Sequence, residues 1–461
     1  MISKNTIYDE LKLNLDFVLK EEYIGEKKKQ KISLMLFETI TNSKLINVTI
    51  MDWLERNASS DIYEIEKLLD DGNINFFSHI KHTNNESFIK ELISGSIGII
   101  IDDLKIGYTF KAVDFPKRAI EMPTSESAFK SSRDSFNETI NSNIGLIREK
   151  IKSPSLIVEQ KVVGSISQTR LGIVYIKDKV DKTVLEELKK RIDLFDKEAV
   201  TSLAVIEEIL LSDNKSAFPN FNYTERLDFF TSSIISGTVG LIVDNFPICY
   251  IVPATMFDLM KSQTDFSNQT TITNMFRGIR FFAAYLGLLL PSTIAIMMYN
   301  IEFVPAKLTE HILEIKEKLP YNYYMEMFII LLAFELLEKA SLRTNKSIGQ
   351  LVPIVGGLIV GDAALKANLI SPLVLIIISF STVSLYTLPN YELRNALKLW
   401  RYLFLIGTYA LSFPGFAIVL IIFIYNLSTI ESFSQTYLYP FVDSDRKFLD
   451  IIFRKDLKHE E

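Results

Sequence analysis

The chain has 461 residues, a formal net charge of -6 and a single cysteine, Cys249. This length allows more than one domain, the acidic balance argues against a nucleic-acid partner, and a lone cysteine excludes an intrachain disulfide. Most charged residues precede Arg280, whereas the long apolar stretches follow it. The sequence therefore predicts a soluble N-terminal region followed by an all-α multi-pass membrane domain, with Cys249 as a small buried apolar residue.

Residues 1–30 are polar and lysine-rich, so they are expected to form a tether. They contain no charged-then-apolar signal sequence, which places the first domain on the cytoplasmic side. From residue 31, short apolar runs alternate with amphipathic stretches, which is typical of mixed α/β structure.

An internal repeat divides this α/β region. Residues 94–102 (SGSIGIIID) match residues 236–244 (SGTVGLIVD). In each copy a helix is expected to end at Ser-Gly, and an apolar strand to end at an aspartate turn. We predict two related α/β subdomains, at residues 31–150 and 151–275. The alternative is that any helix-glycine-strand-turn unit would look similar.

The first apolar segments after Arg280 differ in polarity. Residues 281–300 predict a span kinked at Pro291, and the preceding Arg277 and Arg280 favour a cytoplasmic start. Residues 325–340 are either an interfacial helix or a span surrounded by protein, because three carboxylates interrupt them. These carboxylates belong to Glu326, Glu335 and Glu338.

The later apolar segments predict a hairpin and a final helix. Residues 343–389 are long, apolar and glycine-rich, and their turn is expected between Asn368 and Pro372. Residues 402–427 form the last apolar segment, interrupted at residues 413–415. We therefore predict a membrane domain of four to five spans at residues 276–430 and a polar tail at residues 431–461.

The side of the tail is left open by the sequence. Arg394, Lys398 and Arg401 predict a basic loop before the last apolar segment, and the tail is basic as well. The positive-inside rule does not settle the topology, because both basic segments cannot be cytoplasmic if one straight helix joins them.

The first span of the hairpin has two distinct faces. Small or helix-bending residues recur at every fourth position, which suits close helix packing and also a narrow oligomeric pore. The opposite face is expected to look inward and is the candidate for an ion path or gate. On it Asp362 and Lys366 are spaced to pair, either as a structural contact or as part of an aqueous path. The packing face comprises Gly349, Pro353, Gly357 and Gly361, and the gate face comprises Val352, Val355, Ile359, Asp362 and Lys366.

No motif indicates an enzyme. His79 and His82 are close enough to share a metal, but no cysteine or carboxylate joins them at metal-ligand spacing. The glycines within residues 356–361 are explained better by helix packing than by a dinucleotide, and no phosphate loop or nucleophile elbow is present. We expect no catalytic residue, cofactor or metal.

Several sequence blocks resemble the A subunit of the GerA family of spore germinant receptors, over roughly residues 114–440. The family's P-x-R-x-I-E-x-P-x-x-E block is matched by Pro116, Arg118, Ile120, Glu121, Pro123 and Glu126. Its R-G-P-R-E-G-F-x-E block is retained only as Arg133, Phe136 and Glu138. Further blocks match within residues 143–156, 218–228 and 348–364, with Leu227 where proline is usual.

The resemblance implies two α/β subdomains before a helical membrane domain in the spore inner membrane. It also implies a permease-like B subunit and a lipoprotein C subunit as partners, and A subunits that assemble into a nutrient-gated ion channel. The other interpretations are a non-conducting scaffold or signalling subunit and, with less support, a secondary transporter. Charged residues of the matched blocks, together with Thr224, are expected to serve folding or subunit contact, and Thr224 is also expected to cap the helix that follows it. The residues are Arg118, Glu121, Arg133, Glu138, Thr224, Glu225, Arg226 and Asp228.

Overall fold

The structure is a computed structural model. It describes residues 2–24, 30–42, 50–57, 59–71, 78–115, 134–211, 216–262, 264–300, 302, 319–342, 357 and 361–439. The chain divides into two compact units. The first contains Met1–Ser212, Phe221–Pro253 and Phe433–Gln435, and the second contains Asp213–Asn220, Ala254–Ser432 and Thr436–Glu461.

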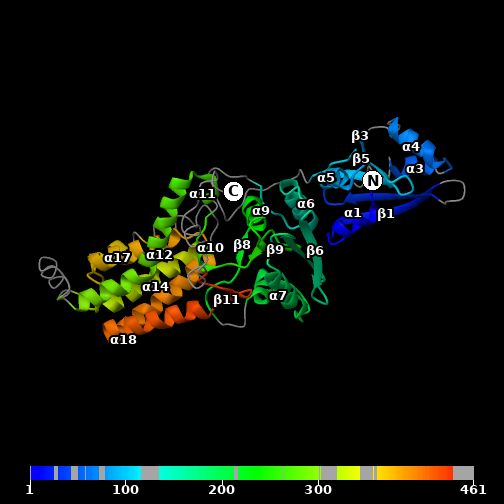
Figure 1. Cartoon of the computed structure of the whole chain (residues 1–461). Coiled ribbons are helices and arrows are strands. Elements are labelled where there is room, and N and C mark those ends of the chain that lie inside the picture. The colour runs from blue at the N-terminus through cyan, green and yellow to red at the C-terminus, as the bar shows by residue number, and fades with distance from the viewer. Residues whose placement is uncertain are drawn as a thin grey trace. The chain divides into compact units, whose positions relative to one another are not determined.

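The first unit contains two five-stranded antiparallel sheets (Figure 1). The first sheet has the order β1-β2-β4-β5-β3, formed by β1 (Phe17–Ile24), β2 (Gln30–Phe37), β4 (Ser96–Ile101), β5 (Ile106–Lys111) and β3 (His79–His82). Its helices are α1 (Lys4–Leu11), α3 (Asp52–Arg56), α4 (Ile62–Asp70) and α5 (Asn85–Ile93).

The second sheet has the order β6-β7-β9-β10-β8. Its strands are β6 (Leu156–Val163), β7 (Thr169–Ile176), β9 (Val239–Val243), β10 (Cys249–Val252) and β8 (Asn222–Thr224). Its helices are α6 (Ile140–Lys150), α7 (Lys182–Asp193), α8 (Leu203–Leu210) and α9 (Leu227–Ile235).

The two sheets are related copies of one arrangement. In each, a hairpin is followed by helices, a third strand, another helix and a second hairpin, and the strand orders correspond position by position. The Asp102 amide donates to the Lys31 carbonyl, and the Asp244 amide donates to the Arg170 carbonyl at the same point of the second copy. The predicted repeat is therefore confirmed by strand order and by these two equivalent turns.

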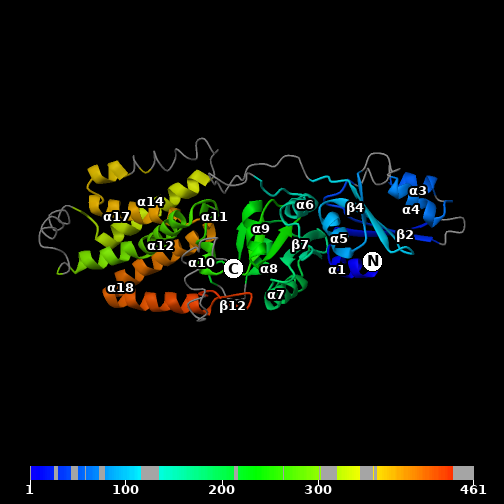
Figure 2. The same ribbon diagram turned by 45° about the horizontal axis from the view of Figure 1, so that its top comes forward.

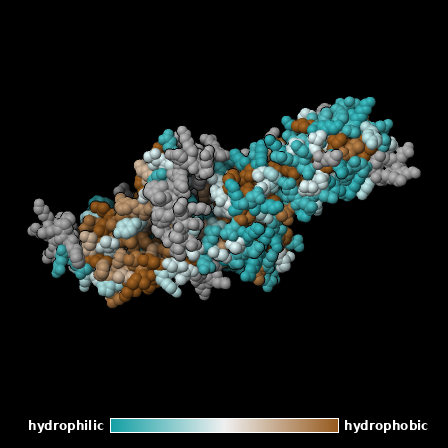
Figure 3. Space-filling view, viewed as in Figure 1, coloured by the Kyte–Doolittle hydropathy of each residue, from teal (hydrophilic) through white to brown (hydrophobic). Residues whose placement is uncertain are grey.

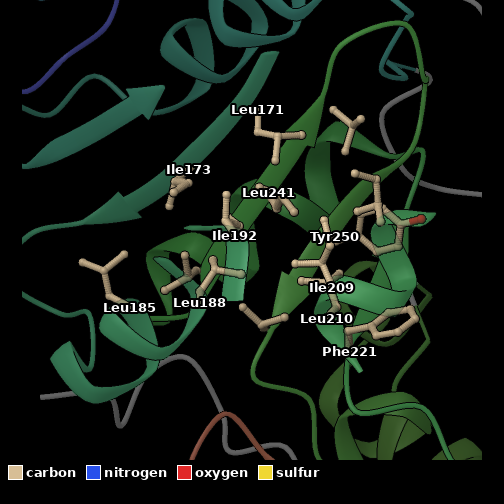
Figure 4. Packing of buried hydrophobic residues seen from close by; sticks show 14 of the residues in the cluster. Leu171, Ile173, Leu185, Leu188, Ile192, Ile209, Leu210, Phe221, Leu241 and Tyr250 are labelled. Atoms are coloured by element: carbon tan, nitrogen blue, oxygen red, sulfur yellow. The ribbon is translucent and has the colours of Figure 1, made fainter. Parts of the chain in front are cut away.

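Helices cover both faces of the second sheet. On one face Leu185, Leu188 and Ile192 of α7 pack against Leu171 of β7 and Leu241 of β9 (Figure 4). The three α7 residues recur at helical spacing, which gives that helix one apolar face. On the other face, α6 and α9 pack against the sheet in a second cluster that includes Cys249. Cys249 is fully buried, as the sequence predicted, and burial raises the pKa of its thiol.

The predicted tether at residues 1–30 is wrong. Ile2, Ile7 and Leu11 are buried beside the first sheet, and β1 is the edge strand of that sheet. The polar composition was misleading because an edge strand and a short amphipathic helix need only one apolar face. The first unit also ends at Pro253 instead of residue 275.

The second unit is helical. Its elements are α10 (Met256–Leu259), α11 (Thr264–Ser267), α12 (Thr270–Tyr299), α14 (Tyr323–Leu342), α17 (Pro372–Tyr386) and α18 (Tyr391–Thr429). Two short strands follow, β11 (Glu431–Ser432) and β12 (Gln435–Thr436). Among the described residues, α12 and α18 are long and apolar enough to cross a membrane, and α17 is a shorter apolar helix. Figure 3 shows hydrophobic surface gathered over this unit.

The predicted turn before α17 is present. Asn368 has a positive φ of 49°, Ser371 caps α17 by accepting from the Val374 amide, and Pro372 occupies the first helical turn. Each residue suits its position, because asparagine tolerates positive φ and proline lacks the amide that a first helical turn leaves unused.

Helix α18 is a hairpin of two arms. Ser412 breaks it with a φ of 53° and a ψ of -133°. The arms lie side by side in Figure 2, and the Trp400 and Phe423 rings meet with centroids 5.0 Å apart. A Cβ on Gly415 would overlap the Gly407 carbonyl oxygen, so glycine allows the two backbones to approach. The interruption expected at residues 413–415 is thus a reversal of direction.

The two ends of the helical unit differ in composition. At one end, Leu393 and Leu427 of the two α18 arms share a core with Met260 and Ala284. We call it the arginine end, because Arg280 binds the Met260 carbonyl and Arg394 lies in the first turn of α18. At the other, the tyrosine end, Tyr324 of α14 contacts the rings of Tyr299 and Tyr409. Both ends of α18 therefore lie at the arginine end, because the helix folds back on itself. This removes the conflict between the basic segment and the tail that a straight helix would create.

The segment after α18 is not a polar tail throughout. Phe433 is fully buried in the cluster between α7 and the second sheet, where the Arg191 guanidinium lies 4.3 Å from its ring centroid. Tyr437 is fully buried in the helical unit. The prediction that a polar tail begins at residue 431 was therefore wrong. The few aromatic residues of this segment are the ones that are buried. Residues 440–461 lie outside the described residues.

Candidate functional site

A charged network is buried among the apolar helices of the second unit. Glu335 and Glu338 lie three residues apart on α14, and Lys398 and Arg401 lie three residues apart on α18. The Lys398 ammonium pairs with Glu338 and lies 3.2 Å from the Glu335 carboxylate. Only 5% of the Lys398 side chain is exposed. The predicted basic loop is wrong, because Arg394, Lys398 and Arg401 belong to the first arm of α18.

Arg401 extends this network to two further helices. It is 1% exposed, and its Nη1 donates weakly to the hydroxyls of Ser381 and Thr382 on α17, at 3.4 and 3.3 Å. The Ser381 hydroxyl in turn donates to the Gly287 carbonyl of α12 at 2.9 Å. Arg401 Nε has no hydrogen-bond partner in the described part of the chain. This arginine is therefore a buried cation served by hydroxyls.

Aromatic residues surround the outer charges of the network. The Tyr386 hydroxyl donates to Glu338 at 3.0 Å. The Arg394 guanidinium lies 5.2 Å from the Tyr386 ring centroid and 5.1 Å from that of Tyr391. Lys339 Nζ donates to the Tyr391 hydroxyl at 3.3 Å. The network contains more cations than carboxylates. The ring faces and phenol oxygens of these tyrosines help to stabilise the additional positive charge.

This network is the strongest candidate functional site because charge within apolar helices is costly. A buried ion pair is tolerated only with good geometry and further hydrogen bonds, and loss of one partner leaves the other charge uncompensated. The arrangement holds α14, α17 and α18 in one relative position. Sequence reasoning missed this network, because the sequence shows only that these charged residues interrupt apolar segments and not which of them meet.

A second buried ion cluster lies at the start of α12. Asp265 accepts from Arg277 Nε at 3.2 Å and also binds Arg280. Arg280 Nη1 donates to the Met260 carbonyl at 2.5 Å. The two arginines are buried, so they anchor α12 to the preceding turn in addition to marking the start of an apolar helix.

Glu326 has a separate position at the tyrosine end. It is fully buried, and its Oε2 accepts from the Ser371 amide at 2.9 Å. Its carboxylate therefore satisfies an amide at the N-terminus of α17, where negative charge is favoured. Helix α14 also buries Met327, Ile330 and Leu331 against its neighbouring helices. Of the two interpretations of residues 325–340, this burial supports a span surrounded by protein.

The predicted gate face is only partly described. Asp362 and Lys366 form an ion pair of 2.6 Å on the surface of this single chain, with 55% and 76% of their side chains exposed. A Cβ on Gly361 would lie 3.5 Å from Leu375, and one on Gly357 would lie 3.8 Å from Phe334, so neither glycine is crowded by the residues that the structure describes. Gly349, Val352, Pro353, Val355 and Ile359 lie outside the described residues.

Residues of the family-like blocks gather around the start of α9. Arg226 is buried, and its guanidinium binds the Asp228 carboxylate through two hydrogen bonds of 3.1 and 2.8 Å. Thr224 was predicted to cap this helix, but it ends β8, and α9 begins at Leu227. Thr224 pairs with Cys249 in the sheet, which outweighs its capping preference. Its hydroxyl accepts from the Arg226 amide at 3.0 Å.

Backbone hydrogen bonds connect the neighbouring family-like block, at residues 133–138, to the region around the start of α9. The Phe136 amide donates to the Glu225 carbonyl at 2.8 Å, and the Asn245 amide donates to the Glu138 carbonyl at 2.7 Å. These contacts are made by main-chain carbonyls, so they position the two segments without assigning a role to either glutamate side chain. Arg118, Glu121 and Arg133 lie outside the described residues.

His79 and His82 do not face a shared metal site. His82 is buried, and its two ring nitrogens contact the hydroxyls of Ser87 and Thr109 at 2.8 and 2.7 Å. Within the described ranges, no group of three histidine, cysteine or carboxylate side chains is placed to hold a metal ion.

The sequence is similar to known spore germination proteins. A family model described as Bacillus/Clostridium GerA spore germination protein matches residues 5–461. Spore germination protein XA of Bacillus anthracis is 30% identical over 360 residues, covering 78% of this chain and 73% of that protein. Spore germination protein KA of Bacillus subtilis (strain 168) is 26% identical over 442 residues, covering 95% of this chain and 81% of that protein.

One solved structure is also similar. It is the N-terminal domain of the A subunit of the Bacillus megaterium spore germinant receptor GerK3, with a TM-score of 0.42 and 19% identity. The match covers 55% of this chain and 93% of that domain. From the match of the family model to nearly the whole sequence, the chain belongs to the Bacillus/Clostridium GerA family of spore germination proteins.

Proposed function

We propose that this chain is the A subunit of a nutrient-responsive germinant receptor in the spore inner membrane, and that its helices conduct ions once a partner binds the nutrient. Family membership supports a role in germination. The observation that carries the membrane part is the buried network of Glu338, Lys398 and Arg401 inside apolar helices, together with α12, which has the length and composition of a span, and the apolar hairpin α18. Ionisable groups inside spans commonly mark functional paths.

The proposed topology places the arginine end on the cytoplasmic side. Lys339, Arg394, Lys398 and Arg401 lie toward this end, and basic residues favour the cytoplasmic face. Tyr299, Tyr324 and Tyr409 lie together at the tyrosine end, and tyrosine is favoured at either membrane–water boundary. Because α12 begins and α18 both begins and ends at the arginine end, the α/β unit and the C-terminal residues share the cytoplasmic side in this topology.

The proposed assembly contains several A subunits, a permease-like B subunit and a lipoprotein C subunit. The exposed Asp362–Lys366 pair supports it, because a half-exposed ion pair on a membrane helix is costly against lipid and favourable against water or another subunit. The uncrowded Gly357 and Gly361 likewise leave room for a neighbouring chain. In this assembly, Val352, Val355 and Ile359 line a narrow path that gates by dewetting.

Ion flux from liposomes tests the proposal. Val355→Ser and Ile359→Ser should each produce leakage without nutrient, because a polar side chain eases wetting of an apolar constriction. Ile376→Ser is the matched control, since Ile376 is an exposed apolar residue of α17 outside the proposed gate. Asp362→Asn should change cation preference if the carboxylate lines the path, and only stability if it serves Lys366. Gly357→Leu should prevent assembly without unfolding the single chain.

If the chain does not conduct ions, the liposome experiment should give the opposite result. A scaffold or signalling subunit would give no flux in liposomes with any variant, although the same variants could still alter germination of spores. If Val355→Ser and Ile359→Ser both stay closed at normal abundance, the proposed gate face does not line the gate.

A further inference from the structure

An apolar cavity opens at the tyrosine end between α14 and the first arm of α18. It has a volume of about 140 Å³ and is lined by Asn322, Tyr324, Met325, Phe328, Leu405, Ile406 and Tyr409. Its volume is close to the ~150 Å³ of an engineered apolar cavity that binds benzene. The space therefore suits a molecule of about the size of a single ring or a short alkyl chain.

One residue of the lining, Tyr324, has its hydroxyl buried in the protein and not in the cavity. Tyr324 is 7% exposed, and its hydroxyl lies beside the Ser412 side chain, out of reach of a molecule in the cavity. A ligand therefore meets the ring of Tyr324, and its polar end must be recognised at the mouth of the cavity.

The mouth of the cavity is amphipathic. Tyr409, Ile406 and Met325 are more than a third exposed, so the cavity is reached from outside the helices. The Asn322 Oδ1 accepts from the Met325 amide at 2.9 Å, which fixes the side chain at the rim with its amide NH₂ available as a donor. An apolar body would lie on Phe328 and Leu405, while a polar end would stay near the rim.

We propose that this cavity is a binding site for small uncharged amphipathic molecules, namely alcohols and phenols that combine one hydroxyl with a compact apolar body. The lining shares no residue with the proposed gate face or with the buried charged network. A charged ligand is disfavoured, because the lining contains no ionisable group except two phenols. A filled cavity would hold the start of α14 to α18 close to Ser412, since the ring of Tyr409 contacts Tyr324 at 5.6 Å just before that reversal.

Photolabelling of the full-length chain in nanodiscs tests the site. The probe is a benzyl alcohol that carries a diazirine, and unlabelled benzyl alcohol is the competitor. Mass spectrometry should find competed labelling on peptides that contain residues 322–328 and 405–409. Asn322→Asp, which keeps the oxygen that accepts from the Met325 amide and removes the NH₂ donor at the rim, should weaken competition about fivefold, the effect of one hydrogen bond of about 1 kcal/mol.

Two further variants separate binding from general membrane partitioning. Leu405→Trp fills the cavity and should abolish competed labelling, with the melting temperature in nanodiscs reporting whether the variant is folded. Tyr425→Phe removes a hydroxyl from an exposed tyrosine of the second α18 arm and should change nothing. Labelling that spreads evenly over the exposed apolar residues, or that free benzyl alcohol does not compete, would overturn the proposal. A competed signal that Leu405→Trp leaves intact in folded protein would place the molecule elsewhere and overturn it equally.

Discussion

The Arg148 guanidinium of α6 binds the Asp16 carboxylate through Nε at 2.7 Å and Nη2 at 2.5 Å, and both side chains are almost fully buried. Asp16 precedes the first sheet and Arg148 precedes the second, so this pair joins the two related subdomains. Asn14 adds to the junction, because its Oδ1 accepts from both Arg148 Nη2 and the Val158 amide at 3.0 Å. The subdomains therefore share a buried polar junction as well as a common strand order.

The first prediction concerns the boundaries of the soluble unit. A fragment of residues 1–253 should be monomeric and soluble without detergent, because both sheets and the Arg148–Asp16 junction lie within it. A fragment of residues 31–275 should aggregate, since it loses β1, Asp16 and the buried residues of α1, and gains the start of α12. Size-exclusion chromatography decides between them. If 31–275 is soluble and 1–253 is not, the N-terminal residues are not part of this fold.

The second prediction concerns Arg148 itself. Arg148→Ala should lower the free energy of unfolding of the 1–253 fragment by about 3–5 kcal/mol, because Asp16 is left buried without its cation. Lys150→Ala is the control, since Lys150 forms a partly exposed pair with Asp134 and should change stability by less than about 1 kcal/mol. Urea denaturation measures both. Equal effects would mean that the junction contributes no more than a surface pair.

The third prediction is a pH dependence of the first subdomain. Burial lowers the pKa of His82 below its ordinary value of 6.5, and the weaker influence of Glu91 opposes this shift. The unfolded chain therefore binds more protons than the folded chain below about pH 6.5, so stability should fall as the pH drops from that value through the folded pKa. His82→Gln should remove this component from the pH profile of urea denaturation, whereas His79→Gln should retain it. An identical slope in both variants would contradict the assignment to His82.

The fourth prediction compares a buried with an exposed ion pair in the helical unit. Lys398→Met should reduce the thermal stability of the purified chain strongly, because Glu335 and Glu338 lose their shared cation in an apolar surrounding. Lys366→Met is matched in chemistry, but its partner Asp362 is exposed, so its effect should be only about 0–1 kcal/mol. The double variant Glu338→Lys/Lys398→Glu should recover part of the loss. Melting curves in detergent that coincide for the two single variants would show that the network is not structurally important.

Much of the architecture was determined by the sequence alone. The shift from charged to apolar composition near Arg280, the repeat at residues 94–102 and 236–244, and the Asn368–Pro372 turn all act through neighbours in the chain. Local structural propensity and the periodicity of apolar residues can be recognised in a sequence, because each depends on a few residues at fixed spacing. The sequence blocks that resemble the family could be recognised for the same reason.

The tertiary structure decided what depends on partners far apart in the sequence. Asp16 and Arg148 are 132 residues apart, and Glu338 and Lys398 are 60 residues apart, so neither pair follows from local spacing. The lysine-rich start joined a sheet because β2 supplied its partner strand, and the last apolar segment folded into a hairpin because Gly407 and Gly415 let its arms meet. Burial of charge is a property of the assembled helices: the residues that resembled a basic loop became an interior network only when α14, α17 and α18 packed around them.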